Sequence, residues 1–155
     1  MQYSDNFMKR LREEIIADEG EVLHIYLDHL GYETVGVGHL IQPGDAEHGK
    51  GEGFQITKTR SDELLFQDLN ICLSECEHHL ERWEHYSEEV KLIIANMAFN
   101  LGITKLKKFK MMFLAIDSGD YVRASEEGLD SRWAKQVYNR AKRLMNRLRD
   151  ADIEE

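Results

Sequence analysis

The chain has 155 residues, 42% of them hydrophobic and 32% charged, which suits one soluble domain with a real core. Its net charge of −9 argues against general nucleic-acid binding, because that activity needs a basic surface. No apolar run approaches the roughly 20 residues of a membrane-spanning helix, so no stable membrane association is expected. The first residues, MQYSDNFMKRLREE, lack the pattern of a secretory signal, so we expect synthesis in a cytoplasm.

The first part of the chain combines one helix with a small sheet. Apolar residues at helical spacing predict a helix over residues 5–17. Its possible N-terminal caps are Ser4, Asp5 and Asn6. Over residues 23–37 apolar residues occupy alternate positions in two runs, and Gly31 lies between the runs. This pattern predicts antiparallel strands joined by tight turns. Residues 42–53 hold the only proline and four of the eleven glycines, so we expect a loop there and a short strand over residues 54–56.

Helices dominate the rest of the chain. Thr57 or Thr59 caps a long helix that reaches about Trp83, and Ser87 caps an apolar helix that stops at Gly102. Shorter helices are predicted over residues 106–116, 121–126, 132–135 and 137–149.

These elements predict an α+β fold, with a small antiparallel sheet lobe and a larger helical lobe joined by a long helix. We expect a single domain over residues 1–155. Its sheet lobe covers about residues 18–58, and its helical lobe covers about residues 84–155 together with the first helix, residues 5–17. A cleft between two such lobes is a natural place for a polymer.

The two cysteines are predicted to be free thiols that pack inside a helix. Cys72 and Cys76 lie four residues apart on the long helix, where they are poorly placed to bridge. Together with His79 they could form a metal site, but three ligands on one helix without a second cluster are a weak signal. We therefore assign no metal.

The segment from Asp18 to His39 contains the residues with the clearest chemical meaning. It carries two carboxylates, Glu19 and Asp28, across a helix-to-strand junction, followed by Thr34. Glycoside hydrolysis needs two carboxylates in unlike settings, one to donate a proton and one to act on water or on the sugar cation. Taken alone, this segment also suits an ordinary helix-end glutamate, a turn aspartate and a strand threonine.

Motifs spread over most of the chain carry a resemblance to a known family. They are DEG at 18–20, IYLD at 25–28, GYETVGVGHL at 31–40, QD at 67–68, NMAFNLG at 96–102 and SRWAKQVYNRAKR at 131–143. In this order and spacing they resemble the phage-type (T4-like) lysozymes, a family of muramidases with a lysozyme-like fold.

The resemblance implies a role for each matching catalytic position. Glu19 matches the general acid, and Asp28 matches the second catalytic carboxylate. Thr34 matches the threonine that helps to hold the attacking water, and Arg140 matches an arginine that pairs with the acid.

Other matching positions are expected to bind substrate or to support the fold. Leu40 and Phe99 match residues that touch sugar, and His39 and Asp68 match a buried structural ion pair. The chain also departs from the family pattern. The loop between His39 and Thr57 is short, residues 135–138 differ, and the net charge is acidic. Glu127 and Met112 stand where small polar residues are expected.

The resemblance implies an endolysin that hydrolyses the β-1,4 bond between N-acetylmuramic acid and N-acetylglucosamine in peptidoglycan, with inversion and without a cofactor. We expect a monomer that binds the glycan strand. It would be made in the host cytoplasm and act in the periplasm once a holin-type lesion opens the membrane. Two alternatives stay open: a related glycosidase acting on chitin-type oligomers, and an inactive wall-binding or virion module with the same fold.

Overall fold

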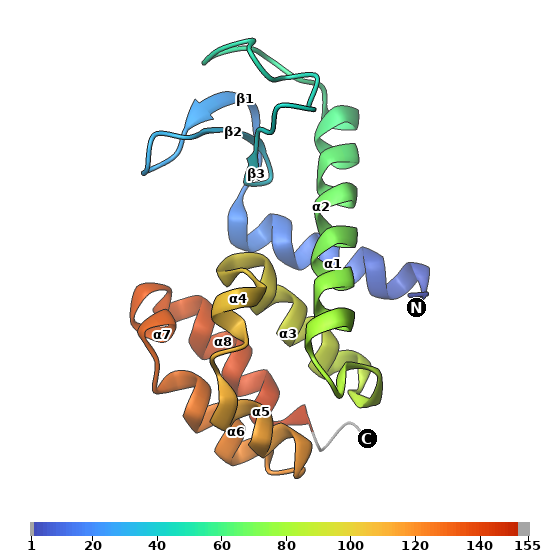
Figure 1. Cartoon of the computed structure of the whole chain (residues 1–155), viewed down its shortest axis with the longest axis vertical. Helices are drawn as coiled ribbons and strands as arrows, with labels where there is room; N and C mark the ends of the chain where they lie inside the picture. Colours follow the sequence, from blue (N-terminus) through green and yellow to red (C-terminus); the bar gives the residue numbers. More distant parts are fainter. Residues whose placement is uncertain (1, 152–155) are drawn as a thin grey trace. The chain divides into compact units, whose positions relative to one another are not determined.

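The computed structural model describes residues 2–151 of the chain (Figure 1). Contacts divide the chain into two compact units. Residues 8–71 form one unit, called the sheet unit below, and residues 1–7 with residues 72–155 form the other, called the helical unit. The last stretch of the predicted helical lobe, residues 152–155, lies outside the described residues. The prediction of one domain over the whole chain stays a prediction.

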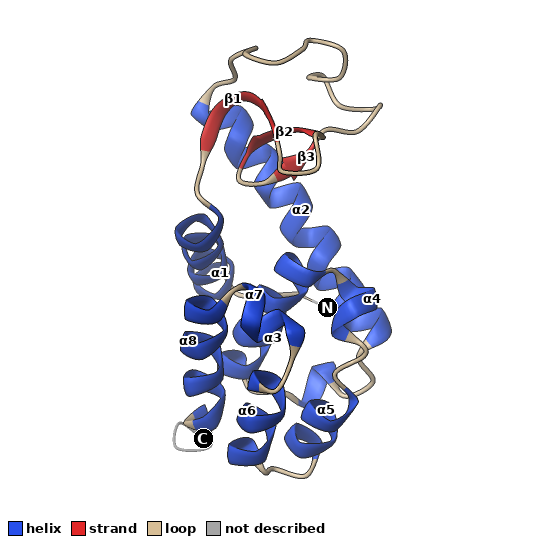
Figure 2. Ribbon diagram, turned by 90° about the vertical axis from the view of Figure 1, so that its left-hand side faces the viewer, coloured by secondary structure: helices blue, strands red, loops and turns tan. Residues whose placement is uncertain are grey.

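The sheet unit contains three short antiparallel strands in the order β1-β2-β3, drawn in red in Figure 2. These strands are β1 (Val22–Leu27), β2 (Glu33–Gly36) and β3 (His39–Leu40). Ile25 and Val35 are fully buried and pack with Leu64, while Ile41 and Ile56 cover the edge of this cluster. The alternation of apolar residues in the sequence therefore gives the sheet one face that packs on the core.

Two helices belong partly to each unit along the sequence. α1 spans Asp5–Glu19, and the Ser4 hydroxyl caps it by accepting from Phe7 N at 3.1 Å. α2 spans Lys58–His79, and the Thr57 hydroxyl caps it by accepting from Arg60 N at 3.0 Å. Both caps satisfy a backbone N–H that has no partner within its helix.

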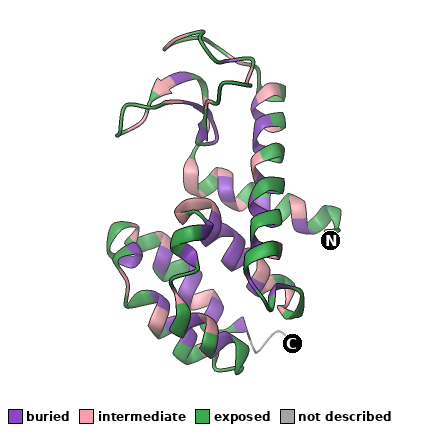
Figure 3. Cartoon of the chain, in the orientation of Figure 1, coloured by how far each residue is buried: buried purple, intermediate pink, exposed green. Residues whose placement is uncertain are grey.

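The helical unit packs short helices around an apolar central one. In chain order these are η1 (Trp83–His85), α3 (Glu88–Leu101), α4 (Ile103–Leu106), α5 (Lys110–Asp117), α6 (Tyr121–Leu129), α7 (Arg132–Gln136) and α8 (Tyr138–Arg149). The body of α3 is buried almost all round, as the purple ribbon in Figure 3 shows. Ser87 caps α3 and Gly102, at φ 82°, ends it, as the sequence predicts. α6 packs against both α5 and α8.

The α+β, lysozyme-like fold class is confirmed, and three predicted elements need correction. The prediction of one helix over residues 106–116 is wrong, because two helices, α4 and α5, lie there. The helix is interrupted between α4 and α5, where Phe109 leaves helical geometry at ψ 54°. There the Phe109 ring packs edge-on against Trp133, with 6.1 Å between the ring centroids. The long helix ends at His79 rather than near Trp83, which opens η1. The strand predicted over residues 54–56 shortens to a single bridge at Gln55.

Three further findings concern the described residues. None of the described helices combines the length and the apolar character that a bilayer crossing requires. Cys72 and Cys76 are both free and buried. Within residues 2–151 no group of three or more His, Cys, Asp or Glu side chains is arranged to hold a metal ion.

Candidate active site

The candidate site is organised by a row of three side chains across the sheet. Tyr26 on β1 pairs with Thr34 on β2, and Thr34 pairs in turn with Leu40 on β3. Directly opposed residues of antiparallel strands project to the same face, so these three side chains share the face opposite Ile25 and Val35. We call them the cross-strand row. It places a phenol, a hydroxyl and an exposed apolar side chain in one line.

Asp28 lies at the end of β1, where the hairpin turn fixes its carboxylate. Its Oδ1 atom accepts from Leu30 N and from Tyr32 N, each at 2.9 Å. The backbone closes the same turn, because Asp28 N donates to Tyr32 O and Gly31 N donates to Asp28 O, both at 2.9 Å. A carboxylate held in this way by its own turn keeps one orientation at the edge of the sheet.

Thr34 is 5% exposed, and its hydroxyl already has a donor role. Its Oγ1 atom donates to Tyr32 O at 3.0 Å. The hydroxyl hydrogen is therefore occupied, and what Thr34 offers to a further partner is the lone pairs of its oxygen. In this state it can accept a hydrogen bond from a water molecule.

Glu19 is the last residue of α1, and its carboxyl group reaches the turn between β2 and β3. Gly20, at φ 77°, ends the helix by donating from its N–H to Ile16 O at 2.8 Å. A Cβ atom added at Gly38 would lie 3.7 Å from Glu19 Oε2, so the carboxyl group sits directly over that glycine. Gly38 also has φ 65°, a conformation that favours glycine.

Both predicted catalytic carboxylates influence Tyr26, the phenol of the cross-strand row. Partial burial, followed by the negative charges of Glu19 and Asp28, raises the pKa of Tyr26 above its usual value. Within the sheet unit the negative charges of both predicted catalytic carboxylates therefore affect the Tyr26 phenol.

His39 lies on the other side of the sheet and holds three segments together. Its Nδ1 atom lies 2.7 Å from Asp68 Oδ2 on α2, and its Nε2 atom lies 2.7 Å from Asp45 Oδ2 in the loop after β3. Burial lowers the pKa of His39, but hydrogen bonds to Asp68 and Asp45 raise it more strongly, to about 9. The ring therefore carries a positive charge between two carboxylates at neutral pH.

Sequence reasoning missed Asp45, the second carboxylate on His39. Gln42 N donates to Asp45 Oδ2 at 2.7 Å. Although burial raises the pKa of Asp45, the hydrogen bonds from Gln42 and His39 bring it below its usual value. Asp45 follows the Pro43-Gly44 pair, which predicts only a turn, so no signal in the sequence points to the histidine.

The helical unit contains the other two predicted site residues. Arg140 on α8 donates from Nε to Asn96 Oδ1 at 2.9 Å and from Nη2 to Asn96 O at 3.4 Å. Asn96 is fully buried on α3, so it tethers the guanidinium group to that helix. Asn96 opens the NMAFNLG motif, but sequence reasoning missed its contact with Arg140, because Asn96 lies inside an apolar run. Phe99, on the same helix, is half-buried. The predicted pairing of Arg140 with Glu19 and the sugar contacts stay predictions.

The two residues that depart from the family pattern have local partners in the helical unit. Met112 is buried, and its sulfur lies against Gly128, where an added Cβ would be 3.2 Å away. Glu127 accepts from Arg123 Nε at 2.8 Å, one turn away on α6. These contacts account for both side chains as parts of the helical unit, and we assign them no role in catalysis.

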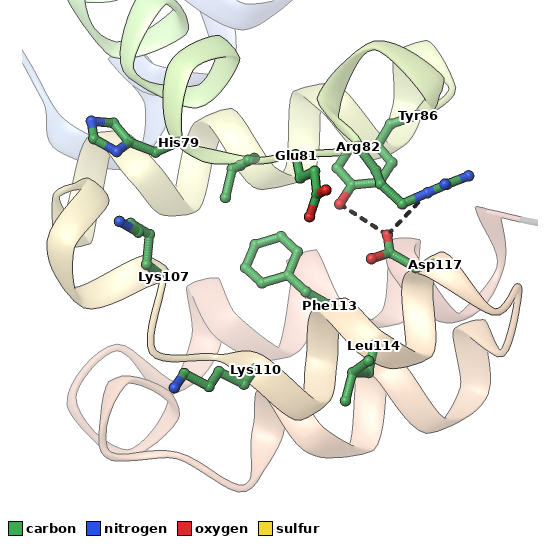
Figure 4. Close-up of a pocket in the computed structure, with 10 residues that line it drawn as sticks. His79, Glu81, Arg82, Tyr86, Lys107, Lys110, Phe113, Leu114 and Asp117 are labelled. Carbon is green, nitrogen blue, oxygen red and sulfur yellow. Dashed lines mark hydrogen bonds and ion pairs between the residues drawn. The ribbon is translucent and has the colours of Figure 1, made fainter.

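A separate pocket of about 240 Å³ lies in the helical unit (Figure 4). His79 and Lys107 stand at one end, the ring of Phe113 lies in the middle, and Tyr86 donates to Asp117 at 3.2 Å at the other end. None of the predicted site residues lines it. Basic and acidic side chains are both present around it, so its charge does not single out a ligand.

Comparison with known proteins identifies the family. Residues 17–151 match the family described as Phage lysozyme. The pre-baseplate central spike protein Gp5 of Enterobacteria phage T4 is 31% identical over 90% of this chain, which spans only 28% of the length of that protein. Two probable T4-type lysozymes of Dictyostelium discoideum are 27% and 26% identical, over 88% of this chain and 91% of theirs.

The fold and the match over residues 17–151 define the class of this protein as a glycoside hydrolase of the lysozyme type. The chain belongs to the phage lysozyme family. The family resemblance inferred from the sequence motifs, and the enzyme class it implied, are both confirmed.

Proposed function

We propose that this chain is a muramidase that hydrolyses the β-1,4 bond between N-acetylmuramic acid and N-acetylglucosamine in bacterial peptidoglycan. One observation carries the proposal: Asp28, fixed by its turn, follows the cross-strand row on β1, and the Glu19 carboxyl group lies over Gly38 in the turn between β2 and β3, within a chain of the phage lysozyme family. Glycoside hydrolysis requires such a pair of carboxyl groups. In the proposed reaction Glu19 protonates the leaving oxygen, and ionised Asp28 acts on the opposite side of the sugar ring.

The local geometry of the sheet unit supports an inverting reaction. The Asp28 carboxylate is held by its turn, and the Thr34 oxygen is free to accept from a water because its hydrogen is donated to Tyr32 O. In the proposed step a water donates one hydrogen bond to Thr34 and gives its other proton to Asp28 as it attacks the anomeric carbon. Such a water needs carboxyl groups roughly 6.5–9.5 Å apart, whereas retention needs about 5–5.5 Å.

Three further residues complete the proposed site. Arg140, tethered by Asn96, would orient the Glu19 carboxyl group, since a guanidinium forms directional hydrogen bonds to a carboxylate. Leu40 is 45% exposed on the cross-strand row, and it would contact a sugar ring together with Phe99. The proposed chemistry uses only side chains and water, so it requires no cofactor.

The test compares wild type with Glu19→Gln, which keeps the shape of the side chain and removes the acidic proton. Clearing of outer-membrane-permeabilised Gram-negative cells should fall at least about 100-fold, the usual contribution of a general acid. Glu13→Gln, an exposed residue of the same helix, is the matched control and should clear cells at the wild-type rate. Equal clearing by Glu19→Gln would show that the acid is misassigned. Clearing by neither protein would favour an inactive module or another glycan.

The stereochemical part of the proposal has its own test. Proton NMR of a digest at early times should show the α anomer at the new reducing end, because inversion converts the β bond to an α product. A β product that only later mutarotates would contradict inversion while leaving the muramidase proposal intact.

We also propose a role in host lysis, in which a monomer made in the host cytoplasm reaches the wall after a holin-type lesion opens the membrane. Expression in the cytoplasm should lyse cells only when a membrane-permeabilising protein is co-expressed. Lysis without that protein would contradict this route.

A second candidate role is a virion-borne module, which is favoured by the 31% identity to the T4 central spike protein. Detection of the chain in purified particles would support it.

A further inference from the structure

Tyr26 is the one member of the cross-strand row that has no role in the proposed reaction. Its side chain lies on the same sheet face as Thr34 and Leu40, because each is directly opposed to the next across the sheet. Asp28 follows two residues later along the chain, with its carboxylate fixed by the turn. Glu19 Oε2 lies over Gly38, in the turn that joins β2 to β3. Tyr26 therefore lies directly opposite one predicted catalytic residue, Thr34, and two residues before another, Asp28.

The hydroxyl of Tyr26 is in the right chemical state to act as a donor. Burial and the charges of Glu19 and Asp28 raise its pKa, so the phenol keeps its proton throughout the neutral range. Among residues 2–151 the structure assigns this hydroxyl no hydrogen bond. The ring is half-buried, which limits its motion and leaves part of it accessible.

A sugar residue is complementary to the cross-strand row in both apolar surface and hydrogen bonding. A pyranose ring has apolar faces and a rim of hydroxyl and acetamido oxygens that accept hydrogen bonds. Leu40 provides exposed apolar surface on the row, whereas the Thr34 hydrogen is already donated to Tyr32 O. Tyr26 is thus the member of the row that has an O–H available to donate.

We propose that Tyr26 contacts the substrate, donating a hydrogen bond from its hydroxyl to an oxygen of the sugar whose glycosidic bond is cleaved. This inference rests on the proposed muramidase function and adds a specificity-determining residue to it. A hydrogen bond to the reacting sugar helps to hold the ring against Glu19 and Asp28, so it matters most as the bond breaks.

The test is Tyr26→Phe, which removes the hydroxyl and keeps the ring. With soluble peptidoglycan oligomers, kcat/KM should fall about 3- to 10-fold, the usual effect of losing one neutral hydrogen bond. Most of the loss should be in kcat, and the melting temperature should stay at the wild-type value. The ratio of wild-type to variant rates should stay constant from about pH 5 to 8, because the phenol does not titrate there.

Tyr86→Phe is the matched control, since it removes a phenol from the pocket of the helical unit, which contains no predicted site residue. It should leave kcat and KM unchanged. A binding measurement separates contact from folding effects. An oligomer should bind Glu19→Gln about 3- to 10-fold more tightly than the double variant that also carries Tyr26→Phe.

The outcomes distinguish this inference from the function on which it rests. If wild type cleaves, Glu19→Gln does not, and Tyr26→Phe matches wild type in kcat/KM and in binding, only the Tyr26 inference is overturned. A fall in activity explained entirely by a lower melting temperature, with binding unchanged, also overturns it. If wild type and Glu19→Gln are equally inactive, the muramidase proposal fails and the Tyr26 contact fails with it.

Discussion

The sheet unit and the helical unit are stabilised in different ways. In the sheet unit a small cluster around Ile25, Val35 and Leu64 is supplemented by buried or half-buried charged contacts. These contacts join His39 to Asp45 and Asp68, Glu47 to Arg60, and Glu21 to Ser61. In the helical unit the central helix α3 buries an almost continuous apolar surface.

This difference has a physical reason and a consequence. Three short strands and a glycine-rich loop offer little apolar surface to bury, so ion pairs and hydrogen bonds must fix the loop and the sheet. The candidate carboxylates lie in the same unit as this polar framework, which needs defined charges to keep its shape. The sheet unit should therefore respond to pH, whereas the helical unit should respond mainly to changes in packing.

The largest expected effect on stability is in the helical unit. Ile93→Ala on α3 removes a fully buried side chain and should lower the free energy of unfolding by about 2–5 kcal/mol, because it loses packing and leaves a cavity. The loss should be the same at pH 6 and pH 8. Ile71→Ala, at a position that is 53% exposed, is the control and should cost far less. A strongly pH-dependent loss for Ile93→Ala would show that the helical unit also depends on charged groups for its stability.

The next effect is in the sheet unit and depends on pH. The pKa of His39 is raised to about 9 from an ordinary value of 6.5, so its stabilisation is complete below about pH 6.5 and disappears as pH rises through 9. A shift of this size corresponds to on the order of 3 kcal/mol. His39→Gln should therefore lower stability at pH 6 and match wild type more closely above pH 9.

Urea unfolding across this pH range measures the effect, and an NMR titration of the His39 ring measures its pKa. The exposed His48 provides the control variant, His48→Gln, which should leave the pH dependence unchanged. A His39 pKa at or below 6.5 would remove the physical basis of this prediction.

The smallest effect separates the two carboxylates on His39. Asp45→Asn keeps the shape of the side chain and removes one negative charge, so it should cost about 1–2 kcal/mol at pH 6. Asp68 remains at 2.7 Å from His39, so the pKa of His39 should fall but stay above its ordinary value. An unchanged His39 titration would mean that Asp45 contributes nothing to the charge balance of the ring.

Much of this molecule could be predicted from its sequence, for reasons that are local. Helical spacing and caps such as Ser87 act within a few residues, so the main helices were predicted close to their observed positions. The strand alternation placed Ile25 and Val35 on the core side of the sheet. The motifs led to Glu19, Asp28 and Thr34, which lie at the end of α1, in the turn after β1 and on β2 of the sheet unit.

What the sequence could not give depends on partners that are distant along the chain. Phe109 leaves helical geometry between α4 and α5, at the point where its ring meets Trp133. In the sequence Asn96 is a single polar residue in an apolar run, and only the folded structure shows that Arg140 donates a hydrogen bond to it. In the sequence Tyr26 is only an aromatic residue of a predicted strand, and the strand register is needed to place it opposite Thr34. Each of these roles requires a tertiary contact, which no local pattern encodes.

The most direct test of the central claim identifies the bond that is cut. Purified peptidoglycan would be digested with wild type, the new reducing ends reduced with borohydride, and the products separated and weighed by mass spectrometry. A muramidase should form products that end in N-acetylmuramitol with wild type, and these products should be absent with Glu19→Gln. Products that end in N-acetylglucosaminitol, or no new reducing ends with wild type, would contradict it.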